Sequence, residues 1–400
     1  MKNYFKGFLS GMLALALILV CVTAFDRSGA ASSNASLTPV FAKMQQIQRL
    51  VDDKFYFEQD AEKIADGAYA GMIYGLDDKF SAYLTPRQYE QSLRSLQGNY
   101  TGIGATVHQD NETLETIVIT VDPEGPAAKA GMQEDDVIVA VDGVDVSQML
   151  LTDIIYDYIM GEVDTQVTIT VERDGKRLDL PMTRKNIIDQ TVNHQMLDDK
   201  TGYLQLTSFE DESVEQFKSA IEDMQKQGME RIVYDLRGNG GGSLSSVIDM
   251  LDYLLPDGLL VYTEDKDGNR LESYEGEDEH EVDIPAVILV DKDSASASEV
   301  FSSAMRDYGR AQLVGTQTYG KGIVQKFFPL EDGSAIKLTV SAYFTKSGTP
   351  IQGEGLTPDV EVEMADGELK DPFEELDAAQ DAQLEAGIRA LEEQARKSVS

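Results

Sequence analysis

A continuous apolar run lies near the start of the chain and contains no charged residue. It covers residues 7–25 and follows two lysines, Lys2 and Lys6. Its length lies between that of a signal-peptide core and that of a membrane-spanning helix. We therefore expect residues 1–29 to form an uncleaved signal anchor, with the lysines on the inner side of the membrane and the rest of the chain outside. Cleavage near residue 29, which would release a secreted chain, is the alternative.

Residues 38–98 show the three- and four-residue spacing of apolar positions that is typical of helices. Pro39, directly after Thr38, marks the start of the first helix, and Pro86 marks the start of a later one. The apolar positions form stripes that consist of Phe41, Met44, Ile47, Leu50, Val51 and Phe55, and of Ile64, Ala68, Met72 and Ile73. We expect a small helical domain over residues 38–98 with these stripes in its core. Contact with a second subunit is the alternative.

Short alternating strands replace the helical pattern between residues 99 and 184. The expected strands lie at residues 105–107 and 117–121. Gly102-Ile103-Gly104 precedes the first of them, and residues 149–160 return to a helical pattern. This region is therefore expected to be a separate β-rich domain over residues 99–184.

Residues 185–365 combine helices with strands that are almost entirely apolar. Such strands are typical of a parallel sheet that is covered on both faces. The expected elements are strands at 202–206, 231–236, 286–290, 323–330 and 335–345, and helices at 213–227 and 244–255. The pattern predicts an α/β domain, with a surface hairpin or excursion in the acidic stretch 257–283.

The tail, residues 366–400, carries one amphipathic helix that we expect to run from Phe373 to Gln394. Its apolar face consists of Leu376, Ala379, Leu384, Ile388 and Leu391. Because an apolar face needs a partner, we expect this helix to dock on the helical domain or on a second subunit.

Composition narrows the classes of partner and of chemistry. The chain has 34 basic and 71 acidic residues, a net charge of −37, which argues against nucleic acid as a partner. Its single cysteine, Cys21, lies within the apolar run, so the remainder of the chain has no disulfide. The chain has three histidines and no His-Glu-x-x-His motif. We therefore expect no metal site and no cofactor.

Two motifs carry the candidate chemistry. The apolar strand 286–290 is followed after a polar turn by Ser-Ala-Ser-Ala-Ser-Glu, residues 294–299, which opens a helix. Side chains this small leave a hydroxyl uncovered. The second motif, Tyr-Gly-Lys-Gly at residues 319–322, places one lysine between two glycines before another strand. A serine and a lysine form a hydrolase dyad when burial keeps the amine neutral, because the amine then takes the proton of the hydroxyl.

A serine and histidine site is the rival arrangement, and the positions of the histidines do not favour it. His280 lies among four acidic residues, which predicts a solvated surface position. His108 and His194 lie in or beside the β-rich region and suit surface or loop roles. Ser294 and Ser298 are expected to be turn or helix-capping residues, with Ser294 the better N-cap.

Together the two motifs resemble those of the carboxyl-terminal processing proteases, the tail-specific Ser/Lys peptidases of family S41 that carry a PDZ domain. In that family the nucleophile is the second serine of the run, which corresponds to Ser296. The resemblance assigns the base to Lys321, 25 residues further on, and an orienting role to Gln325.

The β-rich region resembles a PDZ domain in residues 125–132 and 135–143. The resemblance implies that Gly102, Ile103 and Gly104 form the loop that binds a terminal carboxylate through successive N–H groups. It also makes residues 149–160 the helix beside the binding groove. Related proteases often have an Arg-Gly pair at the end of this helix, whereas this chain has Met160-Gly161.

A glycine-rich stretch after the strand 231–236 resembles another family motif, Asp-Leu-Arg-x-Asn-Pro-Gly-Gly, with Gly240 in place of the proline. The resemblance implies that an N–H group near Gly241 joins the N–H of Ala297 as an oxyanion hole. A phosphate-binding loop is the other interpretation, but the Gly-Lys-Ser/Thr ending of such loops is missing.

The sequence thus predicts a multidomain α/β protein. An N-terminal helical domain and a PDZ-like β-rich domain precede an α/β protease domain, and a C-terminal helix follows. The resemblance implies a membrane-anchored, extracytoplasmic serine endopeptidase that recognises protein C-termini through its PDZ domain and cleaves near them. Its partners are then protein or peptide substrates, and a homodimer through the N- and C-terminal helices is compatible with the patterns. The alternative is a catalytically idle PDZ adaptor.

Overall fold

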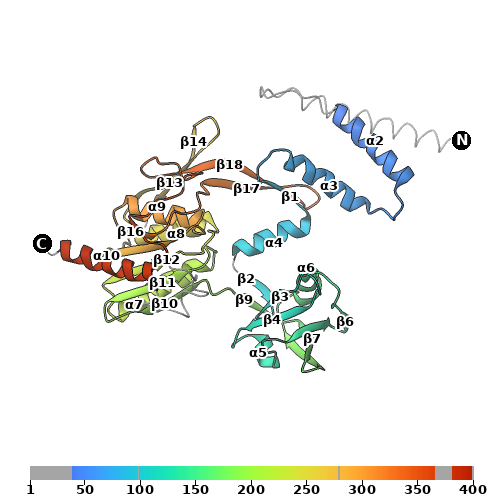
Figure 1. Cartoon of the computed structure of the whole chain (residues 1–400), viewed down its shortest axis with the longest axis horizontal. Coiled ribbons are helices and arrows are strands. Elements are labelled where there is room, and N and C mark those ends of the chain that lie inside the picture. The colour runs from blue at the N-terminus through green and yellow to red at the C-terminus, as the bar shows by residue number, and fades with distance from the viewer. Residues whose placement is uncertain (1–37, 98, 278–279, 365–380, 399–400) are drawn as a thin grey trace. The chain divides into compact units, whose positions relative to one another are not determined.

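A computed structural model describes residues 38–97, 99–277, 280–364 and 381–398 of the chain (Figure 1). It divides into two compact units, Met1–Ile64 and Ala65–Ser400. The predicted anchor at residues 1–29 lies outside the described residues. Across the described ranges, no helix is both long enough and apolar enough to span a membrane.

The first unit contains helix α2, which covers Thr38–Lys54. Because Thr38 is also the first described residue, the predicted start at Thr38 and Pro39 stays a prediction. None of its residues is buried, and Phe41 and Ile47 are 59% and 52% exposed. The prediction that this stripe lies in the core of a small helical domain is therefore wrong for the single chain. Periodicity identifies the apolar face of a helix, but it does not identify what covers that face.

The segment before the β-rich region adds one strand to a sheet that is formed mainly by residues of the α/β region. It comprises α3 (Ala61–Tyr74), strand β1 (Ala82–Leu84) and α4 (Pro86–Gln97). β1 pairs antiparallel with β18, Ala335–Thr345, so that Tyr83 lies opposite Ile336. Residues about 250 positions apart are thus joined, which helical periodicity alone does not indicate.

The β-rich region forms one six-stranded sheet in the order β3-β4-β5-β7-β8, with β6 paired to β5. Its core is made of inward-facing residues such as Val118, Ile138, Val141 and Ile169. β3 lies at the edge of the sheet. The strands are β3 (Ala105–Gln109), β4 (Thr116–Val121), β5 (Val137–Val141), β6 (Val144–Asp145), β7 (Gln166–Arg173) and β8 (Lys176–Thr183), and the helices are α5 (Pro126–Ala130), α6 (Leu151–Asp153) and the π-helix η1 (Ile154–Ile159).

A two-stranded ribbon connects this region to its neighbours. It pairs β2, Asn99–Gly102, with β9, Lys185–Ile188. The chain therefore enters and leaves the β-rich region at one place. Arg184, just before β9, is buried and donates to the carbonyls of Tyr158 and Ile159 at the end of η1.

The α/β region is built on a six-stranded sheet in the order β10-β11-β12-β15-β16-β19, which is parallel except for β10. Helices α7, α8 and α9 belong to the core on one face, where residues such as Leu204, Ile232 and Ile288 lie. The elements are β10 (Val192–Met196), β11 (Thr201–Leu206), α7 (Ser213–Lys226), β12 (Arg231–Asp235), α8 (Leu244–Leu254), β15 (Ala286–Val290), α9 (Ala297–Asp307), β16 (Ala311–Gly315) and β19 (Val360–Glu361).

The C-terminal helix α10, Ala382–Ser398, covers the other face of this sheet (Figure 1). Leu384 and Leu391 are fully buried there against residues such as Tyr203 and Val287. The prediction that this helix docks on the helical domain or on a second subunit is therefore wrong. Its stripe was identified correctly, but the alternate residues of the parallel strands supply the partner surface. The predicted start at Phe373 lies outside the described residues.

A second sheet joins β1, β18, β13 and β14 in that order, with β17 also paired to β18. β13 (Gly258–Glu264) and β14 (Arg270–Gly276) form the hairpin that the sequence predicts in residues 257–283. β17, Ile323–Pro329, follows the predicted lysine motif directly. Lys321 therefore lies just before a strand of this second sheet, whereas Ser296 lies just after a strand of the parallel sheet.

Candidate active site

Ser296 lies in a tight turn between a buried strand and a helix. All five residues of β15 are buried, and α9 begins at Ala297. We call residues 291–297 the serine turn. The backbone of Ser296 has φ 56° and ψ −112°, a conformation that non-glycine residues rarely adopt. A strained strand-to-helix turn of this kind presents a hydroxyl at the end of a sheet.

The two neighbouring serines have structural roles. The hydroxyl of Ser294 donates to the carbonyl of Leu236 over 2.8 Å, and that of Ser298 donates to the carbonyl of Asn239 over 2.8 Å. Both side chains are buried. The N-cap of α9 is Ser296, so the prediction of Ser294 as the N-cap is wrong. The hydroxyl of Ser294 closes the turn instead, because it also accepts from the N–H of Asp291.

Glu299 joins the serine turn to the lysine loop, residues 318–322. Its Oε2 accepts from the backbone N–H groups of Ser296 and Lys321, each over 2.9 Å. Its Oε1 accepts from the N–H of Gly320 and from the hydroxyl of Thr318, over 2.8 and 2.6 Å. The side chain is fully buried, and these donors offset the cost of burying a carboxylate.

No role was predicted for Glu299, although its position in the sequence matches a recognisable pattern. A serine followed three residues later by glutamate, at the start of a helix, is the pattern of a capping box. The pattern accounts for the bond from Ser296, but not for the bonds from the lysine loop. Those depend on segments that are 20 residues apart in the sequence and that meet only in the fold.

The glycines of the lysine loop allow the chain to approach other segments closely. A Cβ atom on Gly322 would lie 2.2 Å from the backbone nitrogen of Gln352, and Gly320 has φ 83°. Lys321 itself is half-buried. Burial, followed by repulsion from the Lys337 ammonium, lowers the pKa of Lys321 below the usual value for lysine. The neutral form of the amine is therefore more accessible here than in an exposed lysine.

Ser296 and Lys321 are neighbours through their backbones. Because both N–H groups donate to the same oxygen of Glu299, the two nitrogens lie within two hydrogen-bond lengths of each other. Within the part of the chain that the structure describes, no hydrogen bond joins the Lys321 amine to the Ser296 hydroxyl. Such bonds are often long in enzymes without bound substrate.

Gln325, the third residue of the predicted set, lies on β17 at an irregularity in the pairing with β18. Its amide nitrogen is 3.5 Å from the carbonyl of Ile323, which is a long contact. The structure describes no hydrogen bond from Gln325 to Lys321. The orienting role of Gln325 therefore stays a prediction.

The two predicted oxyanion donors lie side by side. A Cβ atom on Gly241 would lie 2.9 Å from the nitrogen of Ala297 and 2.7 Å from the carbonyl oxygen of Ala295. Gly241 has φ 104°, so a residue with a side chain would be strained there as well. Its own N–H donates to Oδ1 of Asn239 over 2.8 Å. This N–H must leave Asn239 before it can donate to a substrate.

A buried ion pair supports the glycine-rich stretch that contains Gly241. Arg237 Nε donates to Asp235 Oδ1 over 2.9 Å, and Arg237 Nη1 donates to Asp381 Oδ1 over 3.0 Å. The Tyr203 hydroxyl donates to Asp235 Oδ2 over 2.6 Å. All four side chains are at least nine-tenths buried. Because Asp381 also caps the first turn of α10 through the N–H of Leu384, the C-terminal helix reaches this stretch directly.

The three histidines lie outside this constellation. His280 stacks on Tyr253 with ring centroids 4.1 Å apart, and its Nδ1 is 2.8 Å from the Tyr253 carbonyl oxygen. His194 is 3.2 Å from Asp223, and His108 lies on β3. In the described ranges, no cluster of three or more histidine, cysteine or acidic residues is arranged to hold a metal ion.

The predicted carboxylate loop opens into a cavity of about 360 Å³, which we call the PDZ groove. Gly102, Ile103 and Gly104 line it together with β3 and with Ile155 and Ile159 of η1. Because β3 is an edge strand, its outer side is available to an added strand. The groove therefore has the parts that strand addition requires. α4 also contributes to its wall, which the sequence did not indicate.

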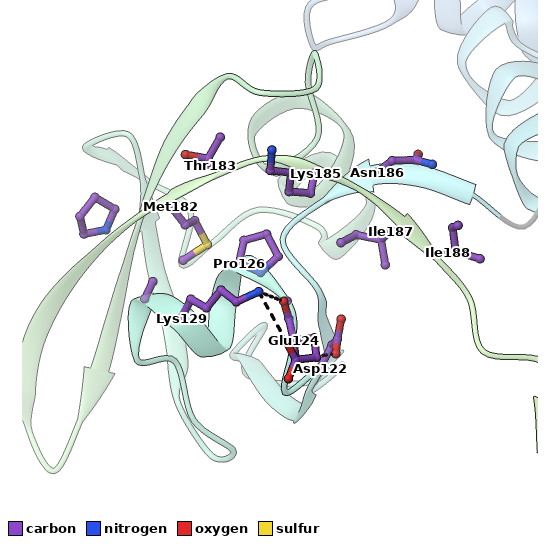
Figure 2. Close-up of a pocket in the computed structure, with 13 residues that line it drawn as sticks. Asp122, Glu124, Pro126, Lys129, Met182, Thr183, Lys185, Asn186, Ile187 and Ile188 are labelled. Carbon is purple, nitrogen blue, oxygen red and sulfur yellow. Dashed lines mark hydrogen bonds and ion pairs between the residues drawn. The ribbon is translucent and has the colours of Figure 1, made fainter.

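A second cavity, of about 420 Å³, lies beside α5 (Figure 2). Lys129 and Glu124 lie close together beside α5, and Ile187 and Ile188 of β9 lie on the opposite side (Figure 2). It shares no lining residue with the PDZ groove. Its mixture of charged and apolar groups points to no particular ligand.

Three family models match the chain. The model of peptidase family S41 matches residues 200–362, that of the PDZ domain matches residues 117–173, and that of the activating protease CtpB N-terminal domain matches residues 22–87. These matches fall on the α/β region, the β-rich region and the segment before it.

Relatives with similar sequences agree with these matches. A probable CtpA-like serine protease of Staphylococcus saprophyticus is 32% identical over 355 residues, which cover 88% of this chain and 71% of the relative. A protein of the same name from Staphylococcus aureus strain N315 is 31% identical over 354 residues, 88% of this chain and 70% of the relative. The structure of a photosystem II D1 C-terminal processing protease is 30% identical, covers 80% of this chain and 86% of that one, and gives a TM-score of 0.48. The chain belongs to peptidase family S41 and is a serine protease that carries a PDZ domain, similar to the CtpA-like serine proteases.

Proposed function

We propose that the chain is a membrane-anchored endopeptidase that binds the free C-terminus of a protein in its PDZ groove and cleaves nearby with Ser296 and Lys321. The observation that carries this proposal is the Glu299 carboxylate, which holds the serine turn and the lysine loop together. The lowered pKa of Lys321 supports the role of base, because a neutral amine is needed to accept a proton.

In the proposed reaction, the neutral amine of Lys321 takes the proton of the Ser296 hydroxyl as its oxygen attacks the carbonyl carbon of the scissile bond. The N–H of Ala297 donates to the oxygen that becomes negative, and the N–H of Gly241 joins it once it has left the Asn239 oxygen. The C–N bond then breaks, and the Lys321 ammonium gives its proton to the leaving amine. Water attacks the resulting ester with Lys321 again as the base, which releases the second product and restores the serine. Gln325 is proposed to orient Lys321 during these steps.

Substrate capture is proposed to use strand addition. An extended C-terminal segment pairs with the free edge of β3, and the N–H groups of Gly102, Ile103 and Gly104 bind its carboxylate. Ile155 and Ile159 then contact its last apolar side chain. Because the chain has a net charge of −37, this local group of donors must capture the anion without help from the overall field.

Anchoring and assembly complete the proposal. The apolar run at residues 7–25 supports an anchor with an extracytoplasmic body, which fractionation of cells that express the full chain would test. The exposed stripe of α2 supports a homodimer contact through that helix, which the molar mass in solution would test. In contrast, the apolar face of α10 is already covered.

Proteolysis by single variants tests the proposed dyad. Ser296→Ala and Lys321→Ala should both lose cleavage of a peptide substrate while the protein stays folded. Lys326→Ala is the matched control, because Lys326 lies on the adjacent strand and makes an exposed pair with Glu272. Full activity in either dyad variant would overturn the assignment. A parent protein that binds peptides but cleaves none would instead favour the idle adaptor.

A further inference from the structure

A short loop between α3 and β1 lies against the lysine loop, although it precedes it by more than 200 residues. It comprises residues 77–81 and is fixed to the second sheet. Asp78 Oδ2 accepts from the hydroxyls of Ser81 and Thr339, over 2.6 and 2.7 Å. The N–H of Thr339 on β18 donates to the Ser81 hydroxyl over 3.1 Å. With β1 paired to β18 directly afterwards, the loop is held in place from both ends (Figure 1).

The two residues at the middle of this loop contact the lysine loop. Lys79 Nζ donates to the hydroxyl of Tyr319 over 2.8 Å. The amine of Lys321 lies 5.0 Å from the centroid of the Phe80 ring, and the amine of Lys79 lies 4.8 Å from the same centroid. Phe80 therefore occupies space beside the Lys321 amine that water would otherwise fill.

The ring affects the amine in two opposing ways. The face of an aromatic ring attracts a cation, which favours the protonated form of lysine. Exclusion of water disfavours that form. Two cations share this one ring, which limits its attraction for either. The groups facing Lys321 also oppose one another, since the ammonium groups of Lys337 and Lys79 lower its pKa and Tyr319 and Glu299 raise it. Burial is the largest contribution, so the pKa of Lys321 is lowered overall.

We propose that Phe80 is a positioning residue for Lys321, which excludes water from the amine and thereby keeps it ready to act as a base. The segment that precedes the PDZ domain then supplies part of the active site. This inference rests on the proposed function, in which Lys321 is the base. The pairing of β1 with β18 then has a functional consequence, because it places Phe80 beside the Lys321 amine.

The pH dependence of kcat/KM for one peptide substrate tests the inference. Phe80→Ala and Phe80→Gln both admit water beside Lys321, and we expect the midpoint of the rising limb to move up by about one pH unit. At pH 7 the rate should then fall about tenfold, because the neutral fraction of an amine falls tenfold for each unit between pH and pKa. Above the new midpoint the variants should regain the parental rate.

Two further variants serve as controls. Phe80→Leu keeps an apolar cover without a ring, so its midpoint should stay near that of the parent. Phe328→Ala removes an exposed phenylalanine from β17 and should leave the profile unchanged. Thermal unfolding shows whether each variant is folded. If Phe80→Ala is not folded, the test rests on Phe80→Gln.

Two outcomes would overturn the inference. An unchanged midpoint in Phe80→Ala and Phe80→Gln would show that the ring does not control the amine. A rate that is lower by the same factor at every pH would show that Phe80 only supports the structure. Failure of the proposed function is distinguishable, because it would appear as an active Lys321→Ala enzyme whatever the Phe80 variants do.

Discussion

Glu299 is the residue on which the account of the site depends most at the scale of single side chains. Its two carboxylate oxygens accept four hydrogen bonds, from both halves of the proposed dyad. A glutamine has nearly the same shape, but its amide nitrogen is a donor and cannot accept from the N–H groups it would face. One pair of bonds must therefore break in Glu299→Gln.

We expect Glu299→Gln to lower kcat by at least about a hundredfold with a smaller change in KM, since misplacement of reacting groups by about 1 Å can cost that much. The free energy of unfolding should also fall, by about 1.5–3 kcal/mol for each bond to the charged group that is lost. Steady-state kinetics and urea unfolding measure the two effects. Glu272→Gln, which removes the negative charge that pairs with Lys326 at the surface, is the control. A variant with the parental kcat would contradict the role of Glu299.

Single residues also show which features of the site the local sequence predicted and which it did not. The small side chains and the run of serines correctly indicated a strand-to-helix turn at Ser296, because both signals are local. The sequence did not indicate which serine caps the helix, since the hydroxyl of Ser294 is taken by Leu236, which is 58 residues away. Phe80 carried no signal of its own, because only the pairing of β1 with β18 brings it to Lys321.

At the scale of elements, α10 links the C-terminus to the proposed oxyanion hole. Asp381 caps this helix and pairs with Arg237, which comes just before the stretch that contains Gly241. The family model ends at residue 362, so this helix lies beyond the matched region. The contact indicates that the helix supports the stretch as well as covering the sheet.

Asp381→Asn tests this link, because asparagine is an equally good N-cap but carries no charge. We expect the free energy of unfolding to fall by about 1.5–3 kcal/mol, the range for a hydrogen bond to a charged group. The exposed pair of Glu385 with Arg389 offers a control, since Glu385→Gln should change stability by no more than about 0.5 kcal/mol. Equal effects in urea unfolding of the two variants would mean that the buried ion pair contributes nothing beyond a surface one.

The helices and strands also show which features the periodicity of apolar residues predicts and which it does not. The alternation of apolar strands and helices correctly indicated the α/β region, because each strand needs both faces covered. The apolar faces of α2 and α10 were recognised as well, but the core position expected for α2 and the partners expected for α10 were wrong. α10 covers the sheet through Leu384 and Leu391, whereas no residue of α2 is buried in the part of the chain that the structure describes. The period of a helix contains no information about its partner.

At the scale of the whole molecule, the PDZ groove and the dyad must act on one substrate. The groove is lined by Gly102, Ile103 and Gly104, and their N–H groups are the proposed ligands of a terminal carboxylate. Overall charge gives no help, because an acidic chain repels an acidic substrate at long range. Recognition is therefore expected to depend on the last residue of the substrate.

Amidation of the substrate tests this expectation. A peptide with a C-terminal amide lacks the carboxylate charge, and its binding should weaken by about 1.5–3 kcal/mol. The rise should appear in KM when the same peptide is compared as free acid and as amide. Replacement of an exposed apolar residue outside the groove, as in Ile119→Ala, should leave the ratio unchanged. Equal KM values for acid and amide would contradict recognition of the terminus.

The most direct test of the central claim is to identify the residue that an active-site serine reagent modifies. The reagent is applied to the full chain, and the adduct is located by mass spectrometry of its peptides. The account predicts a single adduct on Ser296, with labelling that becomes faster as pH rises through the lowered pKa of Lys321 and that is lost in Lys321→Ala. An adduct on another serine, or equally fast labelling of Ser296 in Lys321→Ala, would contradict it.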